Sequence, residues 1–379
     1  MAEKNNATKT TRKSGTKPTG GKKRMTKKER QARQKKRMIL FGVEAILIVV
    51  LGVVLFMVTK VDKMEATDID EDDITFNDGI GSENSAAGVP EGMKGYRNIA
   101  LFGVDSRTGA LGKGTLSDTI IVASINEDTK EVRLISVFRD TYLNLSNDTY
   151  NKANAAYSKG GPKQAINMLN MNLDLNITDY VTVGFQGVVD TIDALGGVEI
   201  DVDEAEINHL NNYQVGTSEA IGRKNQFTKV TSTGMQTLDG IQATSYCRIR
   251  YTAGDDFKRA ERQREVIQAI ATKVKSASAS QLNDIANKVF SQTATSFELS
   301  EILSLLGDVR DYTIVANDGF PFEDLRTTGT ISGKGSCVIP VDLESNVVRL
   351  HKFLFDTDDY EPSSNVRSYS AKIHQDTGK

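Results

Sequence analysis

The feature that most constrains this chain is a run of apolar residues at positions 38–58. These 21 residues contain one charged side chain, Glu44, and a helix of about 20 apolar residues spans the hydrocarbon core of a bilayer. Glu44 lies near the basic end of the run, where a carboxyl group costs less than at the bilayer centre. We therefore predict one transmembrane helix, which divides the 379-residue chain into a short part before it and a long part after it.

The two flanks of this run differ sharply in charge. Residues 1–37 contain fifteen Lys and Arg against two acids, a net charge of +13, and since the whole chain carries −3, the remainder carries −16. The basic segment has almost no large apolar residue and is predicted to be disordered. The positive-inside rule places it in the cytoplasm and everything after residue 58 outside the cell membrane.

A cleavable signal peptide is the alternative to a membrane anchor. The apolar run is longer than a signal peptide needs, and no small-residue cleavage site follows it at 59–64. We therefore predict an uncleaved, single-pass signal anchor at 38–58. It is followed by an acidic, flexible extracytoplasmic stalk at 59–95, a folded domain at 96–360 and a C-terminal tail at 361–379.

Strands and helices alternate along the folded domain. Apolar runs predict strands at 98–104, 120–123, 132–137, 180–185, 198–202, 312–315 and 337–341. Helical spacing predicts helices at 162–173, 186–195, 257–278, 281–290, 296–306 and 345–355. This alternation favours the α/β class: a single three-layer α/β/α domain with a central mixed sheet, preceded by one transmembrane helix.

Charged side chains cluster where the first three predicted strands end or begin. Asp105 and Arg107 follow the first strand, Asp118 precedes the second, and Arg139 and Asp140 follow the third. An α/β sheet places its ligand site at such strand ends. Asp105 and Asp118 are candidate ligands of Mg²⁺, with Mn²⁺ as an alternative, because Mg²⁺ uses one or two carboxylates and takes its other ligands from water and phosphate. The alternative is that both are cap or turn residues.

A second cluster of charge follows between 245 and 267. Arg248 and Arg250 are two positions apart, so an extended segment would direct both to one face. Arg259, Arg262 and Gln263 have i, i+3, i+4 spacing and would share one face of the predicted helix 257–278.

Such a cluster predicts an anionic substrate that carries phosphate. The planar guanidinium group of arginine binds phosphate through two parallel hydrogen bonds and stays charged at any working pH. Asp255 and Asp256, just ahead of the helix, can cap it or contact a ligand. The alternative is a solvated basic helix face paired with Glu261 and Glu265.

Other chemistries lack their motifs. Gly112-Lys113 is not a P-loop, because Arg107 stands where the earlier glycine belongs, and neither a G-x-G-x-x-G nor a G-x-S-x-G sequence is present. The three histidines are scattered, and the two cysteines, Cys247 and Cys337, form no C-x-x-C motif. The cysteines are compatible with one disulfide or with two buried thiols.

Several sequence blocks, in order, resemble the LytR-CpsA-Psr family of cell-wall enzymes. They are Gly103-Val104-Asp105-Ser106-Arg107, Ser117-Asp118-Thr119-Ile120, Ser136-Val137-Phe138-Arg139-Asp140-Thr141, Asn151-Lys152-Ala153-Asn154-Ala155-Ala156-Tyr157, Leu195-Gly196-Gly197-Val198 and Asp256-Phe257-Lys258-Arg259 with Arg262-Gln263. The resemblance extends from about 97 to 267. The family often has Pro at Phe138 and Gly at Lys258, and neither departure touches the charged residues.

The resemblance implies a membrane-anchored phosphotransferase. Such an enzyme moves a glycopolymer, such as teichoic acid or capsule, from an undecaprenyl-pyrophosphate carrier onto peptidoglycan through a phosphodiester. Family roles placed on this chain make Asp105 and Asp118 the Mg²⁺ ligands, and Asp256 and Gln263 the residues that orient the site. The implied pyrophosphate-binding residues are Arg107, Arg139, Lys152, Arg248, Arg250, Arg259 and Arg262.

Two rival functions remain at this stage. A polyprenyl-pyrophosphate hydrolase would use the same site with water as acceptor, and a non-catalytic, membrane-tethered regulator or receptor would bind the ligand without turnover. The basic residues at 1–37 suit membrane lipid headgroups, and they lack the apolar content of a DNA-binding fold, so no specific nucleic acid is expected. We expect the helices at 162–173 and 186–195 to wall a cleft for the carrier lipid.

Overall fold

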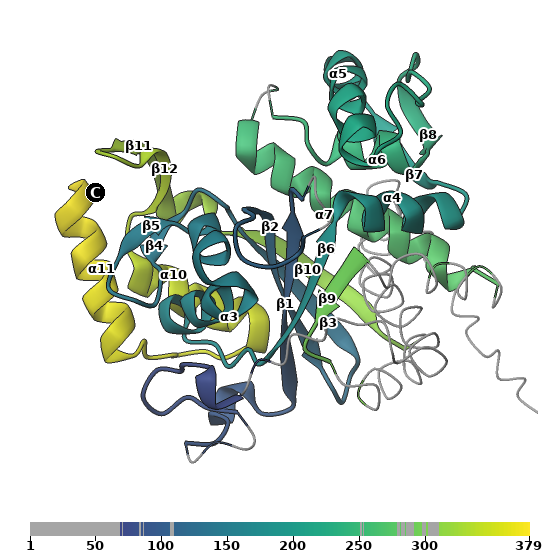
Figure 1. Ribbon diagram of the computed structural model, residues 1–379. Coiled ribbons are helices and arrows are strands. Elements are labelled where there is room, and N and C mark those ends of the chain that lie inside the picture. Colours follow the sequence, from purple (N-terminus) through teal and green to yellow (C-terminus); the bar gives the residue numbers. More distant parts are fainter. Residues whose placement is uncertain are drawn as a thin grey trace, which may run out of the picture.

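The computed structural model describes residues 69, 71–82, 85, 87–106, 110–250, 252, 254–278, 281, 285, 292–297, 301 and 311–379 (Figure 1). The predicted cytoplasmic segment 1–37, the predicted transmembrane segment 38–58 and Arg107 lie outside these residues. Within the described ranges, no helix combines the length and the apolar content that a membrane crossing requires.

A six-stranded mixed sheet forms the centre, with the strand order β10-β3-β2-β1-β6-β9. Its strands are β1 (Tyr96–Val104), β2 (Ser117–Asn126), β3 (Glu131–Val137), β6 (Asp179–Gly184), β9 (Thr293–Thr295) and β10 (Thr313–Phe320). β1 pairs antiparallel with β2 and parallel with β6, while β3 pairs antiparallel with β2 and parallel with β10. The predicted central mixed sheet is therefore confirmed.

Three two-stranded sheets lie outside the central one. They pair β4 (Tyr142–Asn144) with β5 (Tyr150–Lys152), β7 (Val198–Val202) with β8 (Gly234–Leu238), and β11 (Arg326–Ile331) with β12 (Gly335–Pro340). The predicted strands at 198–202 and 337–341 therefore exist as β7 and β12, but they belong to peripheral hairpins.

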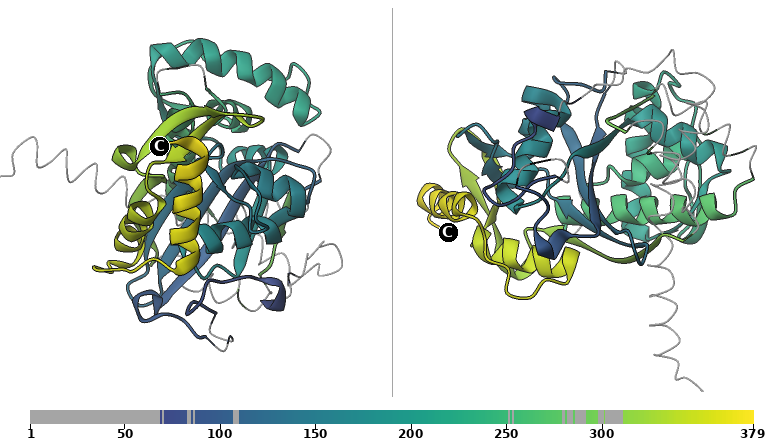
Figure 2. Two further views of the ribbon diagram at one scale, coloured as in Figure 1. Left: turned by 90° about the vertical axis from the view of Figure 1, so that its left-hand side faces the viewer. Right: turned by 90° about the horizontal axis from the view of Figure 1, so that it is seen from below.

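The central strands are buried on both faces, as their almost continuous apolar sequences require. In β1, Ile99 and Leu101 join one hydrophobic core, whereas Ala100 and Phe102 join the other. Successive side chains of a strand point to opposite faces, so the two cores lie on opposite sides of the sheet. Helices cover both, which gives three layers (Figure 2).

One face of the sheet is covered by α3 (Asn154–Leu173), α10 (Leu343–Phe355) and α11 (Ser364–Thr377). The other face is covered by α4 (Phe185–Ala194), α6 (Gly240–Tyr246) and α7 (Asp255–Lys275), and α5 (Glu204–Ala220) packs on α6. Figure 2 shows the yellow C-terminal helices and the green and teal helices on opposite sides of the strands. Three short 3-10 helices complete the described elements: Glu71–Asp73, Glu91–Met93 and Glu323–Leu325.

Two helices that the sequence analysis did not predict have clear start signals. α5 begins with a capping box formed by Asp203 and Glu206, and α6 begins with one formed by Asp239 and Gln242. In each box the N-cap carboxylate accepts the backbone N–H of the third helical residue, whose own side chain accepts the N–H of the cap. The predicted extended segment 245–250 is therefore wrong: it is the end of α6 followed by a loop.

The folded domain extends further at both ends than the sequence suggested. Residues 364–377, predicted as part of a tail, form α11, which buries Val366 and Ile373 in the core. Part of the predicted flexible stalk is also packed, because Ile80 and Met93 are buried in the same core. This segment lies near the start of β1 (Figure 1). The predicted helices at 281–290 and 296–306 fall largely outside the described residues.

The two cysteines lie on opposite sides of the central sheet. Cys247 packs against the core beneath α6 and α7, whereas Cys337 is buried in the core beneath α10 and α11. Both are free thiols. Burial raises the pKa of the Cys247 thiol to about 12. Of the two arrangements left open by the sequence, the structure has two separate thiols.

Candidate active site

A cavity of about 770 Å³ opens beside the C-terminal end of β1, between the sheet and helices α4 and α7. Its inner wall is apolar: β1, β2 and β6 contribute Leu101, Ile121 and Val181, α4 contributes Val188, and α7 contributes Ile270. Charged and polar side chains also line it: Asp105, Asp118, Arg139, Arg248, Arg250, Arg259 and Gln263. The cavity therefore combines an apolar space with a group of guanidinium groups.

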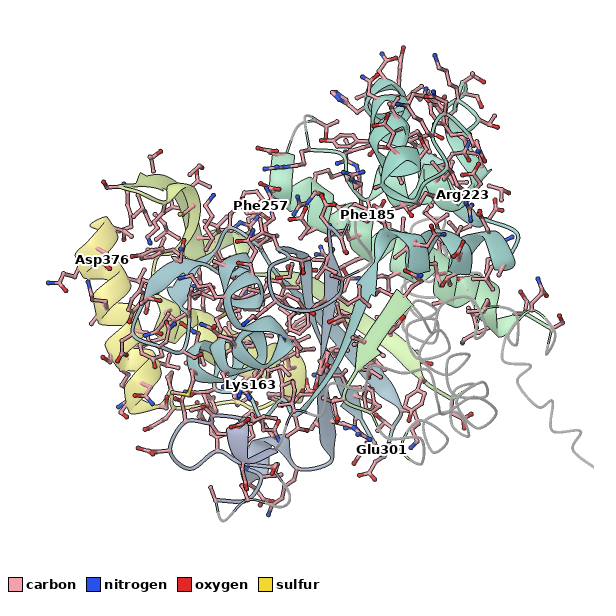
Figure 3. The ribbon with its side chains drawn as sticks, in the orientation of Figure 1. Lys163, Phe185, Arg223, Phe257, Glu301 and Asp376 are labelled. Atoms are coloured by element: carbon pink, nitrogen blue, oxygen red, sulfur yellow. The ribbon has the colours of Figure 1, made fainter. Side chains whose placement is uncertain are left out.

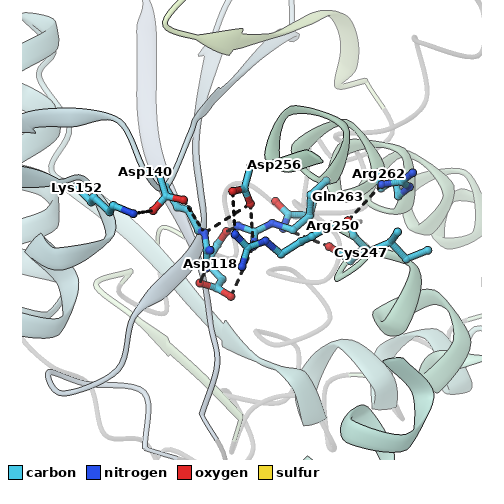
Figure 4. A network of polar contacts seen from close by, with 11 residues as sticks. Asp118, Asp140, Lys152, Cys247, Arg250, Asp256, Arg262 and Gln263 are labelled. Atoms are coloured by element: carbon cyan, nitrogen blue, oxygen red, sulfur yellow. Dashed lines mark hydrogen bonds and ion pairs between the residues drawn. The ribbon is translucent and has the colours of Figure 1, made fainter. Parts of the chain in front are cut away.

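The centre of the charged group is Asp256, in the first turn of α7 (Figure 4). One carboxylate oxygen lies 3.0 Å from Arg250 Nη2, and the other lies 3.4 Å from Arg259 Nη1 and 3.7 Å from Arg139 Nε. Asp256 is not itself part of the cavity wall, whereas the three arginines are. The carboxylate thus holds the arginines from behind and leaves other edges of them directed at the cavity.

Asp118 links the same arginines from the sheet. Its side chain lies 2.8 Å from Arg139 Nη1 and 3.9 Å from Arg259 Nη1, and its backbone carbonyl accepts a hydrogen bond from Arg259 Nη2 at 2.9 Å. Arg259 is crowded by like charge: burial and the neighbouring Arg139 lower the pKa of its guanidinium. At Arg259, therefore, burial and neighbouring cations outweigh the stabilisation that Asp118 and Asp256 give its charged form.

The buried Nε–H groups of Arg139, Arg250 and Arg259 make no hydrogen bond within the described residues. That of Arg139 lies 3.5 Å from Asp140 and 3.7 Å from Asp256, both outside the cavity wall, so the donors without a nearby carboxylate are those of Arg250 and Arg259. A buried guanidinium donor without an acceptor is costly, and an oxyanion in the cavity is the natural acceptor for it. The geometry thus favours an anionic ligand with several oxygens.

Arg248 reaches the cavity from the loop after α6. Its guanidinium carbon lies 4.5 Å from the ring centre of Phe185 and 5.7 Å from that of Tyr213, and its Nη1 donates to Thr217 Oγ1 at 3.0 Å. Phe185 begins α4 (Figure 3). Stacking on aromatic faces fixes the plane of a guanidinium, so Arg248 is directed into the cavity even though no strand carries it.

Most of the predicted site residues lie at the cavity, and Lys152 does not. Asp105, Asp118, Arg139, Arg248, Arg250, Arg259 and Gln263 all line the one cavity, and Asp256 supports it. Lys152 does not line it: its Nζ lies 3.0 Å from Asp140, which in turn lies 3.5 Å from Arg139 Nε. The predicted direct contact of Lys152 with substrate is thus not supported, since Asp140 lies between the lysine and Arg139.

Arg262 is the clearest correction. Its side chain is 1% exposed, does not line the cavity, and donates from Nε to Glu206 Oε1 at 2.7 Å. Arg259 and Gln263 share the predicted helix face and line the cavity, whereas Arg262 contacts Glu206 of α5 and lies away from Asp118 and Asp256 (Figure 4). Arg262 therefore does not hold the ligand.

Only one of the two helices predicted to wall the cleft does so. α4 lines the cavity through Phe185, Val188 and Thr191, whereas no described residue of α3 does, because α3 lies on the other face of the sheet. The second helical wall is α7, through Val266, Ile267 and Ile270. The apolar spacing of α7 is the sequence signal for this second wall.

The two carboxylates at the cavity could supply part of the coordination shell of a hard cation. Asp105 and Asp118 line the same cavity as the arginines, and Mg²⁺ takes as few as two carboxylates when phosphate and water complete its shell. The described residues contain no group of three or more His, Cys, Asp or Glu side chains arranged to hold a metal. Any cation here would thus depend on the phosphate oxygens of a ligand.

Curated relatives share the region that builds this site. The polyisoprenyl-teichoic acid–peptidoglycan teichoic acid transferase TagU of Enterococcus faecalis is 33% identical over 209 residues, covering 55% of this chain and 61% of that protein. The transferase TagV of Bacillus subtilis is 32% identical over 213 residues, covering 55% and 51%. The chain therefore spans about half to three fifths of the length of these relatives.

Solved structures share the fold. The crystal structure of B. subtilis TagV superimposes with a TM-score of 0.54 at 26% identity, covering 71% of this chain and 99% of that one. The structure of TagT bound to LI-WTA gives 0.53 at 20% identity, covering 79% and 98%. The model of the LytR_cpsA_psr family matches residues 52–342, well over half of the sequence. The chain therefore belongs to the LytR_cpsA_psr family.

Proposed function

We propose that this protein is a phosphotransferase that moves a glycopolymer from a polyprenyl-pyrophosphate carrier onto peptidoglycan through a phosphodiester. One observation carries the proposal: the guanidinium groups of Arg139, Arg250 and Arg259 stand at an apolar cavity of about 770 Å³. Few biological ligands unite several adjacent phosphate oxygens with a long apolar chain, and a polyprenyl pyrophosphate does.

Similar proteins support this substrate class. The relatives TagU and TagV are named as polyisoprenyl-teichoic acid–peptidoglycan teichoic acid transferases. A fold neighbour with a TM-score of 0.50 and 19% identity, YwtF (TagT), carries bound octaprenyl pyrophosphate lipid. We place the polyprenyl chain of the carrier along Leu101, Val188 and Ile270, and its pyrophosphate at the arginines.

The reaction forms one bond and breaks another. The hydroxyl oxygen of the acceptor sugar bonds to the phosphorus that bears the polymer. The bond from this phosphorus to the bridging oxygen breaks, the bridging oxygen and its electron pair leave with polyprenyl phosphate, and the hydroxyl proton passes to water. Arg139, Arg250 and Arg259 stabilise the negative charge that develops on the phosphoryl oxygens and on the leaving phosphate. Mg²⁺ held by Asp105 and Asp118 would add Lewis-acid stabilisation of the same charge.

The proposed location follows from the composition of residues 1–58. The fifteen Lys and Arg of residues 1–37, followed by the apolar run 38–58, support a cytoplasmic N-terminus, a single membrane span and a domain outside the membrane. A carrier lipid embedded in the same bilayer would then reach the cavity, and nascent peptidoglycan would supply the acceptor.

The test uses the full chain in detergent micelles with a polyprenyl-pyrophosphate-linked saccharide, Mg²⁺ and peptidoglycan, with mass spectrometry of the glycan. Wild type should form a phosphodiester-linked adduct. Arg139→Ala and Arg250→Ala should each lower its rate on the order of 10²-fold or more while the protein stays folded. Arg223→Ala is the matched control, because Arg223 pairs with Asp190 and Asp193 away from the cavity.

Other outcomes would favour the rival functions. Released polyprenyl phosphate without an adduct would show a hydrolase. Tight lipid binding without turnover, over a range of Mg²⁺ and Mn²⁺ concentrations, would show a receptor. Full transfer by a well-folded Arg250→Ala variant would contradict the site itself.

A further inference from the structure

Arg262 is a buried cation of α7 that the cavity does not use. Its side chain is 1% exposed, and its partner Glu206 on α5 is 3% exposed. Burying a charged pair is costly. In some proteins such a pair is retained because it fixes one specific conformation. The contacts of Arg262 indicate which conformation that is here.

The guanidinium of Arg262 donates in three directions. Nε donates to Glu206 Oε1 at 2.7 Å, Nη1 donates to the backbone carbonyl of Ile249 at 3.2 Å, and Nη2 donates to Thr252 Oγ1 at 2.7 Å. Ile249 lies between Arg248 and Arg250, whose side chains both line the cavity. Arg262 thus holds the backbone of the loop that carries two ligand-facing arginines.

The anchor is fixed in turn. Glu206 accepts a hydrogen bond from the backbone N–H of Asp203 through its other oxygen, at 3.1 Å, as part of the capping box of α5. The same helix carries Thr217 and Tyr213, which contact the side chain of Arg248. One end of the network is therefore the rigid start of α5, and the other end is the arginine loop.

The loop needs such an anchor. No sheet ladder holds residues 248–250, and the like charges of Arg250 and Arg259 repel each other. Without the hydrogen bonds to Ile249 and Thr252, the loop could move to separate the cations. The binding strength of a multidentate anion site depends on keeping its donors in place before the ligand arrives.

We propose that Glu206, Arg262 and Thr252 are positioning residues that hold Arg248 and Arg250 in place for pyrophosphate. This inference rests on the proposed function, since it assumes that the cavity binds the pyrophosphate of a carrier. It reassigns Arg262 from ligand binding to the support of the loop, and it brings in Glu206 and Thr252.

The test compares Thr252→Val with Thr252→Ser in the full chain, in detergent micelles. Valine keeps the shape of threonine and removes the hydroxyl that Arg262 binds, whereas serine keeps it. Inorganic pyrophosphate is the probe, with its Kd measured by calorimetry and the Tm measured in parallel. We expect Thr252→Val to raise Kd about tenfold, the size expected for a lost hydrogen bond to a charged group, and Thr252→Ser to stay within about twofold of wild type. The valine variant leaves a buried donor of Arg262 unpaired, so its Tm should fall somewhat, and Kd is therefore measured at a temperature at which all variants are fully folded.

Thr377→Val is the matched control. Thr377 is similarly half-buried, and its hydroxyl donates to the carbonyl of Ile373 in α11, on the other side of the sheet. The control should bind pyrophosphate as wild type does. Glu206→Gln is a second variant, which keeps an acceptor for Arg262 and removes the charge, and it should also raise Kd.

The outcomes separate this inference from the proposed function. Wild-type Kd for a fully folded Thr252→Val variant would overturn the inference and leave the function standing. An equal rise for the valine and serine variants would also overturn it, because the hydroxyl would not be the cause. Failure of wild type to bind pyrophosphate, or a wild-type Kd for the Arg250→Ala variant, would instead contradict the proposed function.

Discussion

Asp256 is the residue on which the site depends most. Although burial favours its neutral form, the guanidinium groups of Arg259, Arg139 and Arg250 outweigh that effect and lower the pKa of its carboxyl group. A carboxylate with a lowered pKa is a poor acceptor of protons at neutral pH. Asp256 therefore stays ionised at neutral pH and serves as the anion that keeps three like charges together.

Asp256→Asn should remove that anion with little change in shape. We expect polymer transfer to fall on the order of 10²-fold, because Arg139, Arg250 and Arg259 would separate. Asp255→Asn is the control: Asp255 is the preceding residue of the same helical turn, and asparagine tolerates its positive φ of 41°. Rates and Tm would be measured for both. A folded Asp256→Asn variant with wild-type activity would contradict the role.

The same residue predicts a pH limit. A folded-state pKa below the unfolded value means that the ionised carboxylate stabilises the fold above the usual aspartate range, and that this contribution is lost as pH falls through the lowered pKa. The fold should therefore keep the stabilisation by ionised Asp256 from neutral pH down to about 4, the ordinary aspartate value. The free energy of unfolding of wild type and Asp256→Asn across that interval measures it, and a difference between the two that disappears near pH 6 would contradict the prediction.

His351 makes stability sensitive to mild acid. It is buried against Tyr360, with ring centres 3.5 Å apart, and Nε2 lies 3.0 Å from the carbonyl of Leu173. Burial lowers the pKa of the imidazole to about 4. The unfolded chain, with a histidine pKa near 6.5, takes up the proton first. Stability is therefore lost as pH falls from about 6.5 towards 4.

His351→Gln should remove this titration while keeping a donor for the Leu173 carbonyl. At pH 5 the wild-type protein should have lost about 2 kcal/mol relative to pH 7.5 through this group. At pH 7.5 the variant should have a lower free energy of unfolding than wild type. Between pH 7.5 and pH 5 this free energy should fall less in the variant than in wild type. Denaturant unfolding at the two pH values measures the difference. Equal losses in wild type and variant would show that other groups dominate the acid response.

At the scale of elements, the cavity exists because α4 and α7 do not close fully onto β1, β2 and β6. Val188 of α4 faces the space and is only partly buried. Val188→Phe should therefore extend into the cavity without disturbing the core. We expect the Kd of a long polyprenyl pyrophosphate to rise about tenfold, while the Kd of inorganic pyrophosphate stays as in wild type, because only the apolar chain loses room.

Val341→Phe is the matched control for this change. Val341 is exposed and follows β12, so the same substitution there adds a ring to solvent. Both ligands should bind that variant as they bind wild type. If Val188→Phe weakened both ligands equally, the substitution would be acting on the arginines, and the apolar chain would not occupy this space.

The elements also show what the sequence could predict. β1, β2 and β3 were predictable because strands buried on both faces are continuous apolar runs. Arg250 lines the cavity as predicted. The prediction assumed an extended segment, whereas Arg250 lies on a loop. Arg262 was misplaced because its partner Glu206 lies on α5, a helix with a mostly polar sequence. The capping box from Asp203 to Glu206 was the signal that could have revealed α5.

For the whole molecule, the segments before β1 and after α10 meet at one buried acid. Asp174, at the end of α3, accepts hydrogen bonds from Asn77 Nδ2 at 2.5 Å and from the backbone N–H of Ser363 at 2.8 Å. Asn365 in turn donates to Asn77 at 2.8 Å. Such contacts join residues distant in the chain and leave no periodic pattern, which is why the first segment was predicted to be a flexible stalk and the second a tail.

If 364–377 is a structural part of the domain, a core substitution there should destabilise the whole. Ile373 is 1% exposed in the core beneath α3 and α10. Ile373→Ala should lower the free energy of unfolding by about 2–5 kcal/mol, while pyrophosphate binding at permissive temperature stays at the wild-type level, because α11 lies across the sheet from the cavity. Gln375→Ala, an exposed change on the same helix, is the control for helix propensity. Denaturant unfolding of the full chain measures both, and equal stability of the two variants would show that 364–377 is the tail that its composition suggested.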